Sequence, residues 1–181
     1  AACLHARVRL VCGTTGLAPE FMEFIEREAR ERGVGVLIAA NFAIGAVLMM
    51  HFAAQAARFF DNAEIIELHH DQKVDAPSGT AKTTAERMRA ARKDPFVHPP
   101  TEKEIVPGTR GGELGGIAIH SVRLPGLVAH QEVIFGGLGQ TLTIRHDSTG
   151  RDSFMPGVLA ATRAVMGLDH LVVGLDELLL R

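Results

Sequence analysis

The hydrophobic positions in the first part of the chain predict alternating strands and helices. Residues 8–15 form an apolar run without alternation, which is typical of a parallel strand that is covered on both faces. Pro19 opens a stretch with apolar residues on one face and charged residues on the other, and Gly33 is a natural C-terminal stop. A second apolar strand is expected at 34–40. This series predicts a right-handed βαβ unit whose ligand edge lies at the carboxyl ends of its strands.

An uncharged stretch follows the first helix. The chain contains no Asp, Glu, Lys or Arg from Gly33 to Ala57, and such a run is long enough to span a membrane. Asn41, His51 and Gln55 interrupt it, however. Its β-branched first half and the helical spacing of its second half indicate a buried strand followed by a buried helix. We therefore expect no membrane span and no membrane partner.

The pattern changes in the second half of the chain. A strand is expected at 63–70, an amphipathic helix at 78–93 and a long loop rich in Gly, Pro and charge at 99–116. Three short alternating segments then follow, spaced like an antiparallel meander: GIAIHSVR, HQEVIFGG and TLTIRHD. A mixed sheet should therefore follow the parallel one. A last helix at 153–166 and an apolar tail close the chain.

Composition narrows the class of protein. The 181 residues are 46% hydrophobic and 22% charged, as in a globular protein whose core needs neither disulfides nor a structural metal. A formal net charge of -2 argues against a nucleic-acid partner, because phosphate binding needs clustered Lys and Arg. Cys3 and Cys12 show no CxxC or Cys/His ligand spacing, and we expect reduced thiols in a cytoplasmic protein.

A polar helix start predicts an anion site. Ser78, Gly79 and Thr80 would place backbone N–H groups and two hydroxyls at the positive end of the helix, and the glycine lets a ligand approach the backbone closely. Lys73 adds a positive charge and can donate a proton if its pKa is lowered. Each residue alone is also explained as a helix cap or a solvated side chain. Together they favour a site for an anionic ligand.

Two histidines precede this helix start. His69 and His70 point to opposite sides if both lie on the strand, so at most one of them faces the same cleft as Lys73. An imidazole can supply a proton to a developing charge near neutral pH. Zinc held by Glu67 and the two histidines is the alternative, but adjacent histidines rarely chelate one ion from a strand. We expect no metal.

The carboxyl ends of the first two strands carry small residues that can hold a flat ring against the backbone. Asn41 could bind a carboxamide by a hydrogen bond. The alternative is an ordinary turn after the first strand, followed by a strand stop and a core aromatic after the second. The two candidate turns are Gly13, Thr14 and Thr15, and Ala40, Asn41 and Phe42.

The sequence HHDQKVDAPSGTA at 69–81, with GTTG and AANF upstream, resembles the dihydrodipicolinate reductase family, also named 4-hydroxy-tetrahydrodipicolinate reductase, of bacterial lysine and diaminopimelate synthesis. The resemblance runs from about Val11 to the end of the chain. It implies an α/β fold: the C-terminal portion of a Rossmann-like parallel sheet plus an α+β domain with a mixed sheet. Residues 1–42 and 153–181 would belong to the dinucleotide-binding domain, and 43–152 would form the substrate-binding and oligomerisation domain of a homotetramer.

The same resemblance implies a hydride transfer from NADPH or NADH to a cyclic dicarboxylate. His69 matches the family's catalytic proton donor or acceptor, and Lys73 matches its second catalytic residue. The residues that match its substrate-carboxylate site are His70, Ser78, Gly79 and Thr80. Those that match its nicotinamide turns are Gly13, Thr14, Thr15, Ala40, Asn41 and Phe42.

One part of the family pattern has no match in this chain. The family begins with a strand, a Gly-rich phosphate loop and a helix, on the order of 60 residues that would precede Ala1, and neither GxGxxG nor GxxxxGK[ST] occurs. We expect the C-terminal two-thirds of the enzyme, which alone binds NAD(P)H poorly and reduces substrate slowly or not at all. A non-catalytic module that binds dicarboxylates or only oligomerises is the alternative. A third interpretation is another two-domain nicotinamide enzyme, but the His-His-x-x-Lys and Ser-Gly-Thr sequences argue against it.

Overall fold

The computed structural model describes residues 1–14 and 16–180, and these divide into two compact units. One unit comprises Ala1–Val47 and Asp152–Arg181, and the other comprises Leu48–Arg151. The first contains, in chain order, α1 (Ala2–His5), β1 (Leu10–Cys12), α2 (Pro19–Arg32), β2 (Val36–Ile38), the first turn of α3 (Ile44–Ala56), α5 (Met155–Ala164), the short helix η2 (Val165–Gly167), β8 (Leu171–Val173) and α6 (Asp176–Leu179). Another short helix, η1 (Arg151–Phe154), connects the second unit to the first along the chain.

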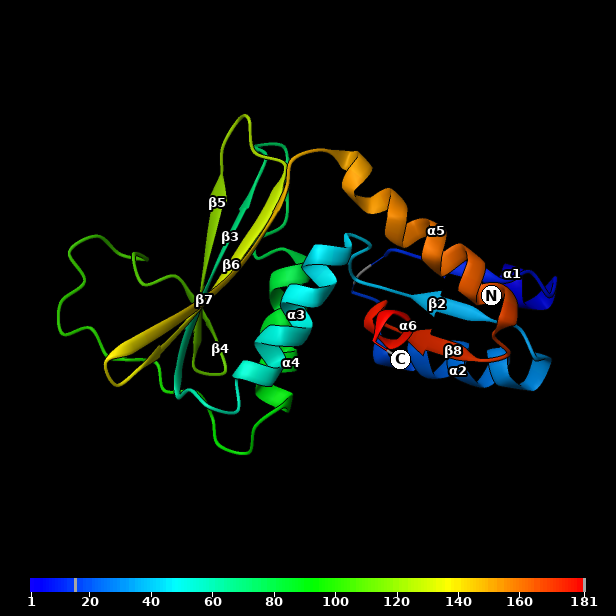
Figure 1. The fold of residues 1–181 in the computed structure, drawn as a ribbon, viewed down its shortest axis with the longest axis horizontal. Coiled ribbons are helices and arrows are strands. Elements are labelled where there is room, and N and C mark those ends of the chain that lie inside the picture. Colours follow the sequence, from blue (N-terminus) through cyan, green and yellow to red (C-terminus); the bar gives the residue numbers. More distant parts are fainter. Residues whose placement is uncertain (15, 181) are drawn as a thin grey trace. The chain divides into compact units, whose positions relative to one another are not determined.

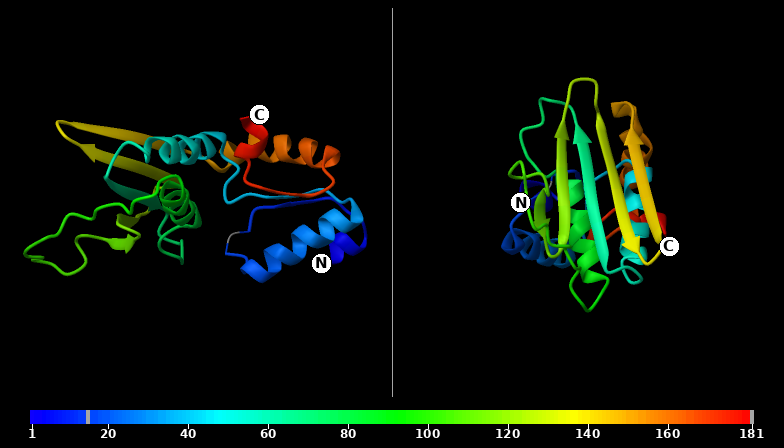
Figure 2. Two further views of the ribbon diagram at one scale, coloured as in Figure 1. Left: turned by 90° about the horizontal axis from the view of Figure 1, so that it is seen from below. Right: turned by 90° about the vertical axis from the view of Figure 1, so that its left-hand side faces the viewer.

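A three-stranded parallel sheet of order β1-β2-β8 forms the centre of the first unit, with α2 and α5 on opposite faces (Figures 1 and 2). Pro19 is the first residue of α2, and Gly33 ends the helix in the left-handed conformation at φ 62°. Ile25 and Ala29 bury the apolar face of α2 against Val36 of the sheet. The predicted strand, helix, strand series is present, although both strands are shorter than the apolar runs that predicted them.

The apolar tail supplies a strand that the sequence pattern did not indicate. β8 pairs in parallel with β2, in the register Leu37 with Val172. Three apolar residues carry too little periodicity to distinguish a strand from a helix or a coil. Residues 171–173 become a strand because the free edge of β2 offers backbone donors and acceptors that a neighbouring strand satisfies.

Gly157 of α5 packs against the backbone that follows β2. A Cβ atom on Gly157 would lie 1.9 Å from the carbonyl oxygen of Phe42. We expect Gly157→Ala to lower the free energy of unfolding by about 1–3 kcal/mol, measured by urea denaturation, because the helix must move away. Gly167→Ala is the control, since no atom lies within 4 Å of its added Cβ. An equal loss in both variants would contradict the packing explanation.

The second unit is built on a five-stranded mixed sheet of order β4-β5-β3-β6-β7. Its elements are the remainder of α3, β3 (Asn62–His69), α4 (Gly79–Ala90), β4 (Gly112–Leu114), β5 (Ile117–Arg123), β6 (Ala129–Gly137) and β7 (Gln140–Ser148). Helices α3 and α4 lie on one face of this sheet (Figures 1 and 2). Along β3, Ala63, Ile65 and Glu67 are buried while their neighbours are half-buried, so the odd-numbered side chains face the helices. In the described residues no helix covers the opposite face.

The predicted antiparallel meander is wrong in one respect. β6 and β7 form an antiparallel hairpin, but β3 lies between β5 and β6, parallel to the former and antiparallel to the latter. Spacing along the chain cannot reveal that an earlier strand occupies the middle of the sheet. The central position pairs the backbone N–H and C=O groups on both edges of β3 with β5 and β6. It also buries the side chains of Ala63, Ile65 and Glu67. The mixed α/β fold class itself is confirmed.

The uncharged stretch behaves as predicted. It forms β2 and α3. Within residues 1–14 and 16–180, no helix combines the length and the apolar character needed to cross a bilayer.

Candidate functional site

The carboxyl end of β3 and the N-terminus of α4 meet in the second unit. β3 ends at His69, so His70 lies just beyond the strand. α4 begins at Gly79 behind the cap residue Ser78, whose Oγ accepts a hydrogen bond of 3.2 Å from the N–H of Ala81. In an α-helix the first backbone N–H groups point toward the N-terminal end and have no acceptor within the helix itself. The strand end and the helix start that the sequence singled out therefore belong to one local structure.

A single buried carboxylate joins the two elements. Glu67 has no exposed surface, and its Oε1 accepts a 3.2 Å hydrogen bond from the Ser78 N–H. Its Oε2 lies 2.5 Å from Nδ1 of His69. Arg123 donates from Nη2 to Oε1 at 2.7 Å and from Nη1 to Oε2 at 2.9 Å. This is a bidentate pair in which both carboxylate oxygens are satisfied.

These contacts keep Glu67 ionised. Burial raises the pKa of Glu67, but the hydrogen bonds from His69 and Arg123 outweigh it and lower the pKa to about 2. A buried charge of this kind is tolerated because it is fully paired. The carboxylate is therefore a permanent anion at physiological pH.

Lys73 lies on the segment between the strand and the helix. Its Nζ is 2.6 Å from the carboxylate of Asp75, and its backbone N–H donates to the His70 carbonyl at 3.2 Å. The hydrogen bond from Lys73 lowers the pKa of Asp75. The carbonyl of Asp75 in turn accepts a 2.8 Å hydrogen bond from Arg123. An incoming carboxylate would compete with the exposed Asp75 side chain for the ammonium group.

The two candidate cofactor turns adjoin in the first unit, because β1 and β2 are parallel neighbours. The Phe42 ring lies 3.2 Å from the position that a Cβ on Gly13 would occupy, so these two turns are in contact. Asn41 uses its side-chain oxygen to accept a 2.8 Å hydrogen bond from the Ala43 N–H, which forms the turn into α3. Thr15 lies outside the described residues.

Comparison with known proteins identifies the family. The family model described as "Dihydrodipicolinate reductase, C-terminus" matches residues 45–179. The chain belongs to the dihydrodipicolinate reductase family. It is 59% identical to the 4-hydroxy-tetrahydrodipicolinate reductase of Geobacillus kaustophilus and 55% identical to that of Bacillus subtilis, and each match covers 97% of this chain and 66% of the relative.

A solved structure of the family supports the same conclusion. The chain matches the structure titled "Dipicolinate bound Dihydrodipicolinate reductase from Paenisporosarcina sp. TG-14" with a TM-score of 0.83 and 51% sequence identity, over 97% of this chain and 66% of that one. The chain thus spans just under two thirds of the length of these reductases.

Two residues at the junction of β3 and α4 were not predicted from the sequence. Glu67 was considered only as a zinc ligand, and Arg123 was given no role. The parallel register of β3 and β5 sets Arg123 beside His69, and this register is a tertiary fact without a local sequence signal. In the described chain no group of three or more His, Cys, Asp or Glu side chains is arranged to hold a metal ion.

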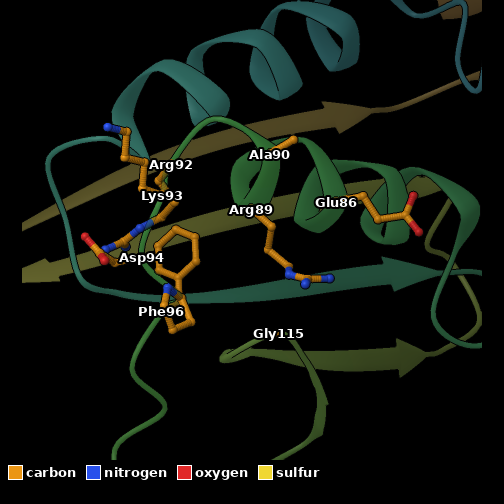
Figure 3. A pocket seen from close by; sticks show the side chains of 9 residues that line it. Glu86, Arg89, Ala90, Arg92, Lys93, Asp94, Phe96 and Gly115 are labelled. Atoms are coloured by element: carbon orange, nitrogen blue, oxygen red, sulfur yellow. The ribbon is translucent and has the colours of Figure 1, made fainter.

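A hollow of about 400 Å³ lies at the opposite end of α4, and Figure 3 shows its lining. Two of its basic residues, Arg89 and Arg92, take part in the packing of the helix end. The Arg92 guanidinium lies 4.4 Å from the centre of the Phe96 ring and also donates to Asp61 at 2.8 Å. Gly115 leaves space for the Arg89 side chain, since a Cβ there would lie 2.1 Å from its Nε. This hollow is separate from the junction of β3 and α4.

Proposed function

We propose that the protein represented by this chain is an NAD(P)H-dependent reductase of 4-hydroxy-tetrahydrodipicolinate in lysine and diaminopimelate biosynthesis. The observation that carries the proposal is the buried Glu67 carboxylate, which ties the imidazole of His69 to the start of α4. This arrangement sets a proton-transfer group beside a helix N-terminus suited to carboxylates. It occurs in a chain that is 51% identical to a reductase solved with dipicolinate.

The substrate would be a cyclic dicarboxylate held from two sides. The first-turn N–H groups of α4 at Gly79 and Thr80, with the Ser78 hydroxyl, would bind one carboxylate by hydrogen bonds and by the helix dipole. Lys73 and His70 would hold the ring and its second carboxylate. His69, together with Lys73, would transfer protons as the 4-hydroxyl leaves as water and the ring accepts a hydride and a proton.

NADPH or NADH would supply the hydride. Residues of the first unit fit the nicotinamide end of such a cofactor, because Gly13 presents backbone without a side chain and Phe42 closes the space beside it. Thr14, Ala40 and Asn41 would complete this surface, and Thr15, which lies outside the described residues, is included on the family resemblance alone. Residues 1–42 and 153–181 would then be part of a dinucleotide-binding domain, and 43–152 the substrate-binding and oligomerisation domain.

A homotetramer in the cytoplasm is part of the proposal. The helix-free face of the five-stranded sheet carries half-buried apolar side chains, including Ile66, Leu68 and Ile134, that a neighbouring subunit could cover. Cys3 and Cys12 are free thiols, as is usual in a reducing compartment.

Calorimetry with pyridine-2,6-dicarboxylate tests this proposal on the chain itself. We expect saturable binding, together with NADPH oxidation far below that of a complete relative, since the chain contains no GxGxxG motif to hold the pyrophosphate. Ser78→Ala should weaken binding about tenfold by removing a helix cap and a hydroxyl. Thr162→Ala, a helical hydroxyl in the other unit, is the control. Absence of dicarboxylate binding would contradict the proposal, and binding without reduction by the complete protein would favour a non-catalytic dicarboxylate-binding module.

A further inference from the structure

The contacts of Glu67 specify how His69 is protonated. An ionised carboxylate only accepts hydrogen bonds, so the ring nitrogen that faces it must carry a hydrogen. The nitrogen in contact is Nδ1, at 2.5 Å from Oε2, and the pKa of about 2 keeps Glu67 ionised. Neutral His69 therefore has its hydrogen on Nδ1 and a lone pair on Nε2, and the imidazolium form adds its second hydrogen at Nε2.

The carboxylate is itself held rigidly. It is fully buried on a central strand, and three N–H groups from two other segments fix its two oxygens. These donors come from Arg123 of β5 and Ser78 at the start of α4. Neither oxygen can rotate away without leaving a donor unpaired. Glu67 thus fixes the imidazole relative to the helix that would hold the substrate.

We propose that Glu67 is a positioning residue that keeps the hydrogen of His69 on Nδ1 and reserves Nε2 for proton exchange with the bound dicarboxylate. This inference rests on the proposed function for its ligand, but its first consequence, the tautomer, is a property of the chain alone. The tautomer and the proposed function can therefore be disproved independently of each other.

Nitrogen-15 NMR of histidine-labelled chain measures the tautomer directly. The His69 signals are identified by their loss in His69→Gln, and at a pH where their titration shows a neutral ring they should report a protonated Nδ1 and a bare Nε2. The tautomer itself is measured on the unaltered chain. A bare Nδ1 with a protonated Nε2 would overturn the inference, whatever the chain binds.

Glu67→Gln should invert the tautomer. Each carboxylate oxygen faces two donors, but of these four groups only the imidazole can become an acceptor. The amide oxygen therefore belongs at the Oε1 position and the NH2 group faces Nδ1, where the Arg123 Nη1 group loses its acceptor. Nδ1 then becomes an acceptor and the hydrogen moves to Nε2. In the intact protein, kcat should fall about 10- to 100-fold while KM changes less than threefold, as for the loss of an orienting hydrogen bond. An inverted tautomer with unchanged kcat would show that Nε2 does not exchange the proton.

Glu64→Gln is the matched control. Glu64 lies on the same strand but faces the other side of the sheet, where it contacts Nε2 of His120 at 2.9 Å and Arg110 at 2.7 Å. The substitution removes the same charge from a second Glu, His and Arg group. It should alter the signals of His120 and leave those of His69 unchanged. Equal changes at His69 in both variants would show a general effect of charge and contradict positioning by contact.

Discussion

Replacing Lys73 by alanine in the intact protein should lower kcat on the order of 10³-fold. The substitution removes the ammonium that we propose as a proton donor and carboxylate partner, and loss of a general acid typically costs 10²- to 10⁴-fold. Lys73 is 20% exposed and its ion-pair partner Asp75 is 56% exposed, so the fold should lose little. Steady-state NADPH oxidation measures the rate, and thermal unfolding checks the fold.

The control for Lys73 is a cation outside the site. Lys93 lies just past the end of α4, where Figure 3 shows it beside the other basic residues of that hollow. Lys93→Ala removes the same charge from the protein and should leave kcat unchanged. A similar rate loss in both variants would indicate a dependence on overall charge. An unchanged rate in Lys73→Ala would remove this residue from the mechanism.

Acid should destabilise the second unit through protonation of Glu67. Its pKa falls from an ordinary 4.5 to about 2 in the folded chain, a difference worth about 3 kcal/mol of unfolding free energy. Because the folded pKa is the lower one, this stability is present above pH 4.5 and is lost as the pH falls toward 2. Urea denaturation across this range measures the loss.

Glu67→Gln separates this contribution from general acid unfolding. The variant should be less stable than the original chain at neutral pH, because Arg123 loses a buried anionic partner. The difference should shrink as the pH approaches 2, where the original side chain is also neutral. Glu64→Gln should show a smaller effect, since Glu64 is 33% exposed. A difference that stays constant between pH 7 and 2 would contradict the assigned pKa.

Parts of the site were readable from local sequence. Ser78 before a helical pattern predicted the cap that the structure shows, because a hydroxyl at that position satisfies an otherwise unpaired N–H. The placement of two histidines at a strand end was readable from the apolar run before them. Glu67 could not be assigned its contacts in this way. A carboxylate on the buried face of a strand looks like an error in the pattern until Arg123 is known to lie beside it.

The sequence by itself determined the order of strands and helices from β1 to α4, the helix start at Ser78 and the family, since these depend on residues near one another along the chain. Tertiary structure alone decided that β3 is the central strand, that β8 completes the parallel sheet, and that Arg123 neutralises Glu67. The physical reason is that each of these depends on pairing between distant segments. Such pairing is selected by the burial and hydrogen bonding of the whole sheet and not by the periodicity of either partner.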